Sequence, residues 1–215
     1  MRVGGTRAER YDRIKRAFDA TAAAVVFVLT LPVLALAALA IRARDGRDVL
    51  FHQDRLGIHG TTIRVTKLRT MRARQDGRRG ADGRDGPQRV TGVGRVIRRF
   101  KVDELPQLLG VVRGDLSLVG PRATLVRYLP EYDQYERRRL EVMPGLTGWA
   151  QINGGTELTH RERNVLDVWY VDNRSLLLDT SILIRTIPSI LSGERPNMTA
   201  LGVANDHETL TRGRP

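Results

Sequence analysis

Residues 20–41 read ATAAAVVFVLTLPVLALAALAI, and no charged side chain occurs among these 22 positions. At the rise of an α-helix this run would extend roughly 33 Å, about the thickness of the hydrocarbon core of a bilayer. The run therefore predicts a membrane-embedded helix, next to which the rest of the chain must fold.

Two features of this run favour a re-entrant helix over one that spans the bilayer. Pro32 lies in its interior, where a proline removes a backbone hydrogen bond and kinks a helix. Both sides of the run are basic, and the positive-inside rule then places both sides in the cytosol. We therefore expect a helix broken at Pro32 that leaves by the face it entered, with Thr30 bonding a carbonyl that the proline frees. The basic residues are Arg2, Arg7, Arg10, Arg13, Lys15, Arg16, Arg42, Arg44 and Arg47.

Two other interpretations of the run stay open. A plain spanning helix has the required length. A cleaved signal peptide would use the basic start and the Ala-Leu-Ala triplet at 38–40, but its apolar region is usually only about 7–15 residues long.

The charge of the chain predicts an anionic partner. The sequence has 36 Lys and Arg against 24 Asp and Glu, and the stretch 42–99 alone has sixteen against six. A basic block directly after an apolar one suits an anionic membrane surface or phosphorylated substrates. Aromatic residues are only 5%, which argues against single-stranded nucleic acid, and we expect no nucleic acid partner. The absence of Cys excludes disulfides and thiolate metal sites.

Beyond residue 42 the pattern predicts short strands and several helices. Thr159 and Glu162 are spaced as a capping box at the start of one helix. The segment 176–191 is strongly apolar and either fills a core or lies in the membrane interface. Expected are strands at 49–51 and 62–68, a mobile loop at 74–88, helices at 94–100, 105–112, 130–142, 159–170 and 176–191, an irregular or extended stretch at 146–153, and a tail from about 195.

The adjacent acids Asp103 and Glu104 are the sharpest candidates for chemistry. Pro106 fits the first turn of a helix, so the two acids precede or open that helix. Adjacent carboxylates at a helix start could hold Mg²⁺ against a diphosphate, or one could attack phosphorus while the other handles a proton. The alternative is a pair of capping acids worth about 1 kcal/mol.

Three basic residues are candidates for phosphate contacts. Arg122 follows a Gly-Pro turn that would present its planar guanidinium at a defined position. Lys67 and Arg69 end a predicted strand, where alternation places them on one face as a phosphate clamp. A solvated turn and an ordinary basic strand end are the alternatives.

Several turn-forming residues surround Trp149 in the stretch 144–151, which reads PGLTGWAQ. This loop could hold a base or pack the floor of a site, with Gln151 as a substrate contact, or Trp149 could simply lie in a core. The four His residues show no ligand spacing, and there is no P-loop or dinucleotide-binding glycine pattern.

Taken in order, these motifs resemble the bacterial sugar transferase family of monotopic phosphoglycosyl transferases. The resemblance runs from about Tyr11 to about Leu191, and the ordered set is far more specific than any single motif. The set comprises the basic and apolar start with Pro32, then KLRTM at 67–71, DELPQL at 103–108, GDLSLVGPR at 114–122, PGLTGWAQ at 144–151 and DVWYV at 167–171.

The resemblance implies a two-step transfer at the cytoplasmic face of the bacterial inner membrane. Asp103 would attack the β-phosphorus of a UDP-sugar, release UMP and form a covalent sugar-phosphate ester, which polyprenyl (undecaprenyl) phosphate then takes over. Mg²⁺ would sit near Asp103, Glu104 would activate or orient the acceptor, and Lys67 and Arg122 would lie at the site. Members of the family start exopolysaccharide, O-antigen and glycoprotein glycan assembly.

Two positions depart from the family pattern. The family's Pro-Arg-Pro signature ends here in Ala123 in place of the second proline, which leaves the local geometry to be established. An Arg that many members use for a phosphate contact is replaced by Gly155, so Arg161 or Arg163 is expected to serve instead.

The expected fold is α+β and mostly helical. An N-terminal re-entrant membrane helix precedes a small cytosolic catalytic domain with interfacial amphipathic helices and a few short strands. A non-enzymatic, membrane-anchored basic module that binds anionic lipid or nucleic acid is the alternative, and the segment 176–191 is also compatible with a homodimer. The expected organisation is a basic segment 1–16, a membrane helix 17–42, a transferase domain 43–192 and a tail 193–215.

Overall fold

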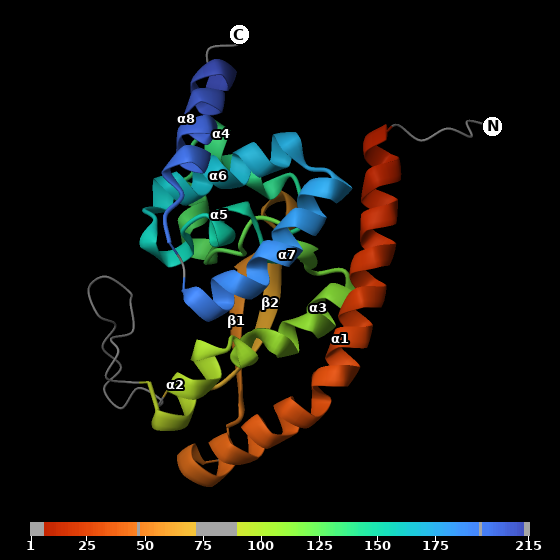
Figure 1. Ribbon diagram of the computed structural model, residues 1–215, viewed down its shortest axis with the longest axis vertical. Coiled ribbons are helices and arrows are strands. Elements are labelled where there is room, and N and C mark those ends of the chain that lie inside the picture. The colour runs from red at the N-terminus through yellow and green to blue at the C-terminus, as the bar shows by residue number, and fades with distance from the viewer. Residues whose placement is uncertain (1–6, 47, 72–89, 194, 213–215) are drawn as a thin grey trace, which may run out of the picture.

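The computed structural model describes residues 7–46, 48–71, 90–193 and 195–212, so the loop expected at 74–88 lies outside the described residues. A long helix, α1, runs along one side of a domain built mainly of shorter helices (Figure 1). The longer elements are α1 (Arg7–Asp45), β1 (Leu50–Leu56), β2 (Thr62–Leu68), α2 (Gly92–Arg99), α3 (Leu108–Arg113), α6 (His160–Asn173), α7 (Leu176–Ser192) and α8 (Met198–Arg212). The shorter ones are η1 (Ile58–Gly60), η3 (Val102–Gln107), β3 (Ser117–Val119), η4 (Val126–Glu131), α4 (Gln134–Arg137), η5 (Arg138–Leu140), β4 (Gly145–Thr147), α5 (Trp149–Ile152) and η6 (Gly155–Glu157).

Helix α1 is continuous through Pro32 and bends partway along its length (Figure 1). The proline lacks the N–H that would bond the Val28 carbonyl four residues earlier. The Thr30 hydroxyl donates instead to the carbonyls of Val26, at 2.8 Å, and Phe27, at 3.1 Å. The expectation that Thr30 bonds the carbonyl freed by Pro32 is therefore wrong. Bonding of this kind to preceding carbonyls itself bends a helix, so two neighbouring residues favour the bend.

The apolar surface of α1 is largely uncovered by protein. Within the described ranges, one helix segment, Glu9–Arg44, is long and apolar enough to cross a membrane, and only 6% of its most apolar 18-residue window is buried. An exposed apolar surface of this extent is costly in water and marks a site of contact with lipid or another apolar partner. Its exposed residues include Val25, Val28, Leu29, Leu31, Val33, Leu36 and Leu39.

Elsewhere α1 packs firmly on the domain. Ala23 is fully buried against Leu108 and Val111 of α3. The Arg16 guanidinium donates to the carbonyls of Val111 and Val112, at 2.6 and 2.7 Å, and so satisfies carbonyls at the end of α3 that have no partner within the helix. The helix is thus fixed to the segment that directly follows Asp103 and Glu104.

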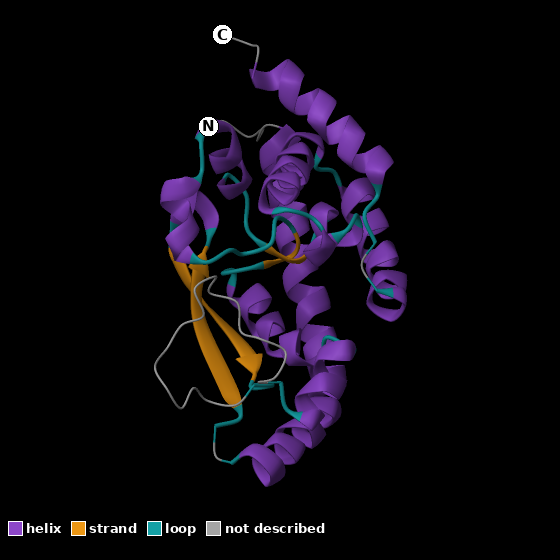
Figure 2. Cartoon of the chain, turned by 90° about the vertical axis from the view of Figure 1, so that its left-hand side faces the viewer, coloured by secondary structure: helices purple, strands orange, loops and turns teal. Residues whose placement is uncertain are grey.

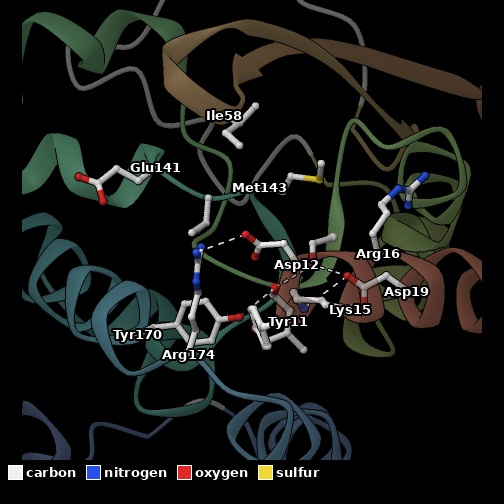
Figure 3. Close-up of a pocket in the computed structure, with 13 residues that line it drawn as sticks. Tyr11, Asp12, Lys15, Arg16, Asp19, Ile58, Glu141, Met143, Tyr170 and Arg174 are labelled. Atoms are coloured by element: carbon white, nitrogen blue, oxygen red, sulfur yellow. Dashed lines mark hydrogen bonds and ion pairs between the residues drawn. The ribbon is translucent and has the colours of Figure 1, made fainter. Parts of the chain in front are cut away.

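A polar network ties α1 to α6 and α7, and Figure 3 shows its members Tyr11, Lys15, Asp19 and Tyr170. Lys15 lies 2.9 Å from Asp179 and 3.3 Å from Asp19. Asp179 also accepts hydrogen bonds from Tyr11, at 2.8 Å, and Tyr170, at 2.7 Å. A cavity of about 180 Å³ lies beside this network. Because Lys15, Asp19 and Asp179 are paired within the chain, the network orients α1 on the domain.

The strands form two small sheets. β1 and β2 make an antiparallel hairpin in which Phe51 pairs with Lys67, and Figure 2 shows it extending along the side of the domain away from most helices. β3 and β4 pair in parallel, with Ser117 opposite Gly145. The strand predicted at 62–68 is confirmed, while the strand predicted at 49–51 is longer than expected because it matches the length of its partner.

The helix predicted at 130–142 is wrong. That region consists of η4, α4 and η5, and the true N-cap is Asp133, which forms a capping box with Glu136. Asp133 favours a helix start rather than a helix interior, so the segment is interrupted there. The capping box predicted for Thr159 and Glu162 is confirmed at the start of α6.

The C-terminal segment is not a tail, since it forms helix α8, which packs on α6. Ala200, Leu201 and Ala204 are buried in the same cluster as Leu166 and Val168 of α6. Residues 200, 201 and 204 lie on one helical face. The small alanines made this apolar face inconspicuous in the sequence.

Candidate active site

Asp103 and Glu104 lie in η3, the turn that leads from α2 into α3. Lys101, two residues before Asp103, has left-handed backbone angles (φ 54°, ψ 19°), an unusual conformation for a residue with a side chain. This reversal makes the sharp change of direction that presents the two acids. Their predicted position at the start of a helix is close to the observed one, since α3 begins at Leu108.

Glu104 is held between two cations that come from distant parts of the chain. Its Oε1 accepts hydrogen bonds from Lys67 Nζ on β2, at 2.5 Å, and from Arg122 Nη2 after β3, at 2.6 Å. Burial disfavours the ionised Glu104, but Arg122 and Lys67 outweigh burial and hold the pKa of Glu104 well below its usual range. Glu104 is therefore an anion that accepts hydrogen bonds from both cations.

Lys67 is half-buried, with 21% of its side chain exposed. Burial lowers the pKa of the Lys67 ammonium, and the adjacent Glu104 opposes that decrease. The hairpin register places Lys67 opposite Phe51, with its side chain directed toward η3 and Glu104. A lysine that is desolvated but still paired is suited to contact an incoming phosphate group.

Asp103 differs from Glu104 in its surroundings. It is only 7% exposed, and within the described part of the chain no side chain donates a hydrogen bond to its carboxylate. Burial, followed by repulsion from Glu104, raises the pKa of Asp103, while Lys67 and Arg98 oppose this rise. Two adjacent carboxylates whose pKa values are shifted in opposite directions are suited to different roles. Asp103 is the one left available to react.

Arg55, on β1, is a site residue that sequence reasoning missed. Its Nη1 donates to the carbonyl of Ala123, at 3.0 Å, so it lies beside the Arg122 segment. Burial and then repulsion from Arg122 lower the pKa of Arg55 to about 10. Alternation along β1 could have placed Arg55 on the same face as Gln53, but nothing local connects that face with residue 122.

The remaining predicted contacts lie elsewhere in the structure. Arg69 pairs with Asp48, at 3.0 Å, and Arg161 with Glu208 on α8, at 3.1 Å. Arg163 donates to a backbone carbonyl of its own helix cap, at 3.3 Å. The buried amide of Gln151 contacts no hydrogen-bond partner within the described ranges. The structure thus brings together Lys67, Glu104 and Arg122 of the predicted set, while Arg69 and Arg161 pair with acids elsewhere.

Asp103 fits the role of a magnesium ligand as a single carboxylate. No cluster of three or more His, Asp or Glu side chains that could hold a metal exists among the described residues. Mg²⁺ is commonly bound through one or two carboxylates together with substrate phosphates and water. Among the described residues the buried Asp103 carboxylate has no side-chain hydrogen-bond donor, whereas Glu104 is already engaged by two cations.

The turn that carries Arg122 depends on close backbone contact. A Cβ built on Gly148 would lie 2.2 Å from the Gly120 carbonyl oxygen, so Gly148→Ala must displace the segment that leads to Arg122. We expect Gly148→Ala to lower the free energy of unfolding by roughly 1–3 kcal/mol and to reduce activity, measured by thermal denaturation and initial rates. Gly202→Ala is the control, since its Cβ would meet nothing within 4 Å inside α8, and it should be slightly stabilising. A Gly148→Ala variant as stable and active as the control would contradict this packing argument.

Comparison with known proteins places the chain among sugar transferases. The model of the family described as bacterial sugar transferase matches residues 10–193. The sugar transferase EpsL of Bacillus subtilis (strain 168) is 45% identical over 183 residues, which cover 84% of this chain and 89% of EpsL. A Caulobacter vibrioides protein named UDP-glucose:undecaprenyl-phosphate glucose-1-phosphate transferase is 44% identical over 193 residues, covering 84% of this chain and 71% of its own.

A third relative is the exopolysaccharide production protein ExoY of Rhizobium meliloti (strain 1021). It is 36% identical over 191 residues, which cover 82% of this chain and 84% of ExoY. The matched range extends from α1 to the end of α7 and includes Lys67, Asp103, Glu104 and Arg122. The family resemblance drawn from the ordered motifs is confirmed, and the chain belongs to the bacterial sugar transferase family.

Proposed function

We propose that this chain transfers a sugar 1-phosphate from a UDP-sugar to undecaprenyl phosphate, as the first membrane step in assembling an exopolysaccharide. The observation that carries the proposal is the asymmetry of the two acids: Glu104 is fixed by Lys67 and Arg122, while Asp103 is left without a side-chain partner among the described residues. Family membership makes the chain an enzyme of the phosphoglycosyl transferase type. The names of the Caulobacter and Rhizobium relatives supply the acceptor and the pathway class.

In the first step a carboxylate oxygen of Asp103 attacks the β-phosphorus of the UDP-sugar. The bond between that phosphorus and the bridging oxygen breaks, and UMP leaves with the electron pair. The product is a sugar-phosphate ester on Asp103. In the second step an oxygen of undecaprenyl phosphate attacks the same phosphorus, the Asp103 carboxylate leaves, and undecaprenyl diphosphate sugar is formed.

Lys67 and Arg122 provide the positive field that this chemistry requires. Negative charge accumulates on the oxygens around the reacting phosphorus, and preorganised cations stabilise it without rearrangement during the reaction. Glu104 holds both cations in place, at 2.5 and 2.6 Å, and so aligns them before substrate arrives. The Arg122 side chain is still 41% exposed, so its guanidinium remains accessible to a diphosphate. Mg²⁺ bound at Asp103 would add charge neutralisation for the diphosphate and favour the ionised carboxylate.

We further propose that α1 enters the bacterial cell membrane from the cytoplasmic face and returns to that face at its bend. The bend of α1, the proline inside it, the uncovered apolar surface and the basic residues on both flanks support this proposal. A re-entrant helix would place η3 and the acids at the membrane surface, where a lipid phosphate is accessible. A long straight span would instead place the two flanks on opposite sides.

The topology can be tested by cysteine labelling, because the chain has no native Cys. Arg13→Cys and Arg44→Cys lie on exposed positions on either side of the apolar run. In inverted membrane vesicles both should react with a membrane-impermeant maleimide, and in intact spheroplasts neither should. Labelling of one position in spheroplasts and the other in inverted vesicles would show a spanning helix and contradict the proposal.

The activity can be tested by measuring UMP release from a panel of UDP-sugars in the presence of undecaprenyl phosphate. UDP-glucose is the first donor to try, because the Caulobacter relative is named for it. We expect UMP and a lipid-linked sugar diphosphate to form in equal amounts with at least one donor. Tight binding to anionic liposomes with no UMP release from any donor would favour a non-enzymatic basic module instead.

A further inference from the structure

Arg139, on η5, is a charged side chain within the protein core and has no place in the reaction described so far. It is 3% exposed and faces Asp167 of α6, which is 1% exposed. The guanidinium donates to the Asp167 carboxylate, the Tyr132 hydroxyl at 2.6 Å, the Thr124 hydroxyl at 3.1 Å and the Arg122 backbone carbonyl at 3.0 Å. Arg139 therefore contacts the backbone of the residue whose side chain holds Glu104.

A buried ion pair of this kind is not explained by stability alone. Removing two charges from water is expensive, and apolar residues of similar size often replace such pairs without loss of stability. An apolar pair, however, could not donate to the Arg122 carbonyl. The feature specific to Arg139 is its set of planar donors: Nε and Nη2 bond Asp167, Nη2 also bonds the Arg122 carbonyl, and Nη1 bonds Thr124 and Tyr132.

A second guanidinium holds the next residue of the same segment. Arg55 donates to the carbonyl of Ala123, at 3.0 Å, from the opposite side of the chain. The backbone carbonyls of Arg122 and Ala123 are thus bonded by two different arginines, the buried Arg139 and the half-buried Arg55. Ala123 has the ordinary backbone freedom that a proline would remove, so this restraint has to come from hydrogen bonds.

We propose that Arg139, assisted by Arg55, is a positioning residue for transfer: it fixes the backbone at Arg122 so that the Arg122 guanidinium meets Glu104 and the substrate diphosphate. This inference rests on the proposed function, which assigns Arg122 and Glu104 to the site. Arg139 does not contact the reacting atoms and acts only through Arg122. Its removal should therefore affect turnover far more than it affects binding of the UDP-sugar.

Arg139→Lys tests this role, because lysine keeps the charge and loses the fork. We expect kcat for UMP release to fall by about 10- to 100-fold, with KM for the UDP-sugar changed by less than about 3-fold, since small misplacements of a catalytic group are that costly. Arg138→Lys is the matched control, because Arg138 pairs with Asp172 at the surface and has no contact with Arg122 among the described residues. It should be indistinguishable from wild type. An Arg139→Lys enzyme as fast as the control would overturn the proposal.

A double-mutant cycle separates positioning through Arg122 from a general defect. In an Arg122→Ala background the further change Arg139→Lys should cost less than about 2-fold, because the group that it positions is gone. An equal loss in both backgrounds would show that Arg139 does not act through Arg122. If Arg139→Lys does not fold, the pair Arg139→Met with Asp167→Leu replaces it, since apolar pairs are commonly tolerated. That variant should fold and turn over slowly, and full activity would overturn the proposal.

Hydrogen exchange provides a readout that does not depend on activity. The backbone amides of residues 122–125 should exchange faster in Arg139→Lys than in Arg138→Lys or wild type, because one restraint on that segment is lost. Unchanged exchange would contradict the restraint. Absence of UMP release by the wild-type enzyme would instead count against the proposed function, so the two failures can be told apart.

Discussion

Asp103→Asn is expected to lower the rate of UMP release from a UDP-sugar by about 10³-fold or more, as removal of a nucleophile does in other covalent mechanisms. The amide has the size of the carboxylate but no charged oxygen that can attack phosphorus. Asp103 accepts no side-chain hydrogen bond among the described residues, so the substitution removes no such bond from the fold. Initial rates measured beside thermal denaturation would therefore show a large loss of activity in a normally folded protein.

Asp115→Asn is the matched control for this substitution. Asp115 forms an exposed pair with Arg113, at 3.2 Å, and exposed pairs of this kind contribute about 0–1 kcal/mol. Asp115 follows α3, whereas Asp103 precedes it, and the side-chain partner of Asp115 among the described residues is Arg113. An Asp103→Asn enzyme that keeps more than about a tenth of wild-type activity would rule out Asp103 as the nucleophile.

Glu104→Gln is expected to have the second largest effect, a loss of about 10²-fold in activity together with about 2 kcal/mol of stability. The neutral amide cannot compensate the charges of Lys67 and Arg122, which lie 2.5 and 2.6 Å from the carboxylate. Lys67 is half-buried and would be left as a poorly compensated cation. Both losses are measured from initial rates and from the free energy of unfolding, each compared with wild type. Glu141→Gln is the control, because Glu141 is exposed and pairs with Arg138.

The same substitution predicts a specific pH dependence of stability. The pKa of Glu104 in the folded protein lies below its unfolded value, which is about 4.3. The stability that Glu104 contributes is therefore fully present above that unfolded value and is lost as pH falls toward the folded pKa. The difference in unfolding free energy between wild type and Glu104→Gln should be constant from about pH 6 to 8 and shrink below about pH 4. A difference that grows on acidification would contradict the pairing.

The elements that could be predicted from the sequence are those whose signals are local. The apolar run of α1, the alternation of β2 and the capping box of α6 each arise within a few residues, and the structure contains all three. The helix predicted at 130–142 was wrong because Asp133 is an N-cap that interrupts a charged stretch of helical composition, and this cap was not recognised. Helix α8 was missed because its buried face is made of alanines and one leucine, too weak an apolar signal to stand out.

The order of the motifs predicted which residues belong to the site but not how they come together. Lys67, Glu104 and Arg122 were each expected near the site, but their convergence depends on the hairpin folding against η3 and on β3 pairing with β4. Arg55 and Arg139 could not be found, because an arginine that bonds a distant backbone carbonyl has no local signature in a chain with 36 Lys and Arg. Burial and partners, which distinguish these two from surface arginines, are properties of the folded chain.

The most direct test of the account is mass spectrometry of the enzyme incubated with a UDP-sugar, such as UDP-glucose, in the absence of undecaprenyl phosphate. The covalent mechanism predicts about one equivalent of UMP released per enzyme and a sugar-phosphate adduct on the peptide that contains Asp103. Addition of undecaprenyl phosphate should discharge the adduct, and Asp103→Asn should never form it. Two results would contradict the assignment of Asp103 as the nucleophile. One is an enzyme that turns over when undecaprenyl phosphate is present but forms neither UMP nor an adduct when it is absent, and the other is an adduct on a different residue.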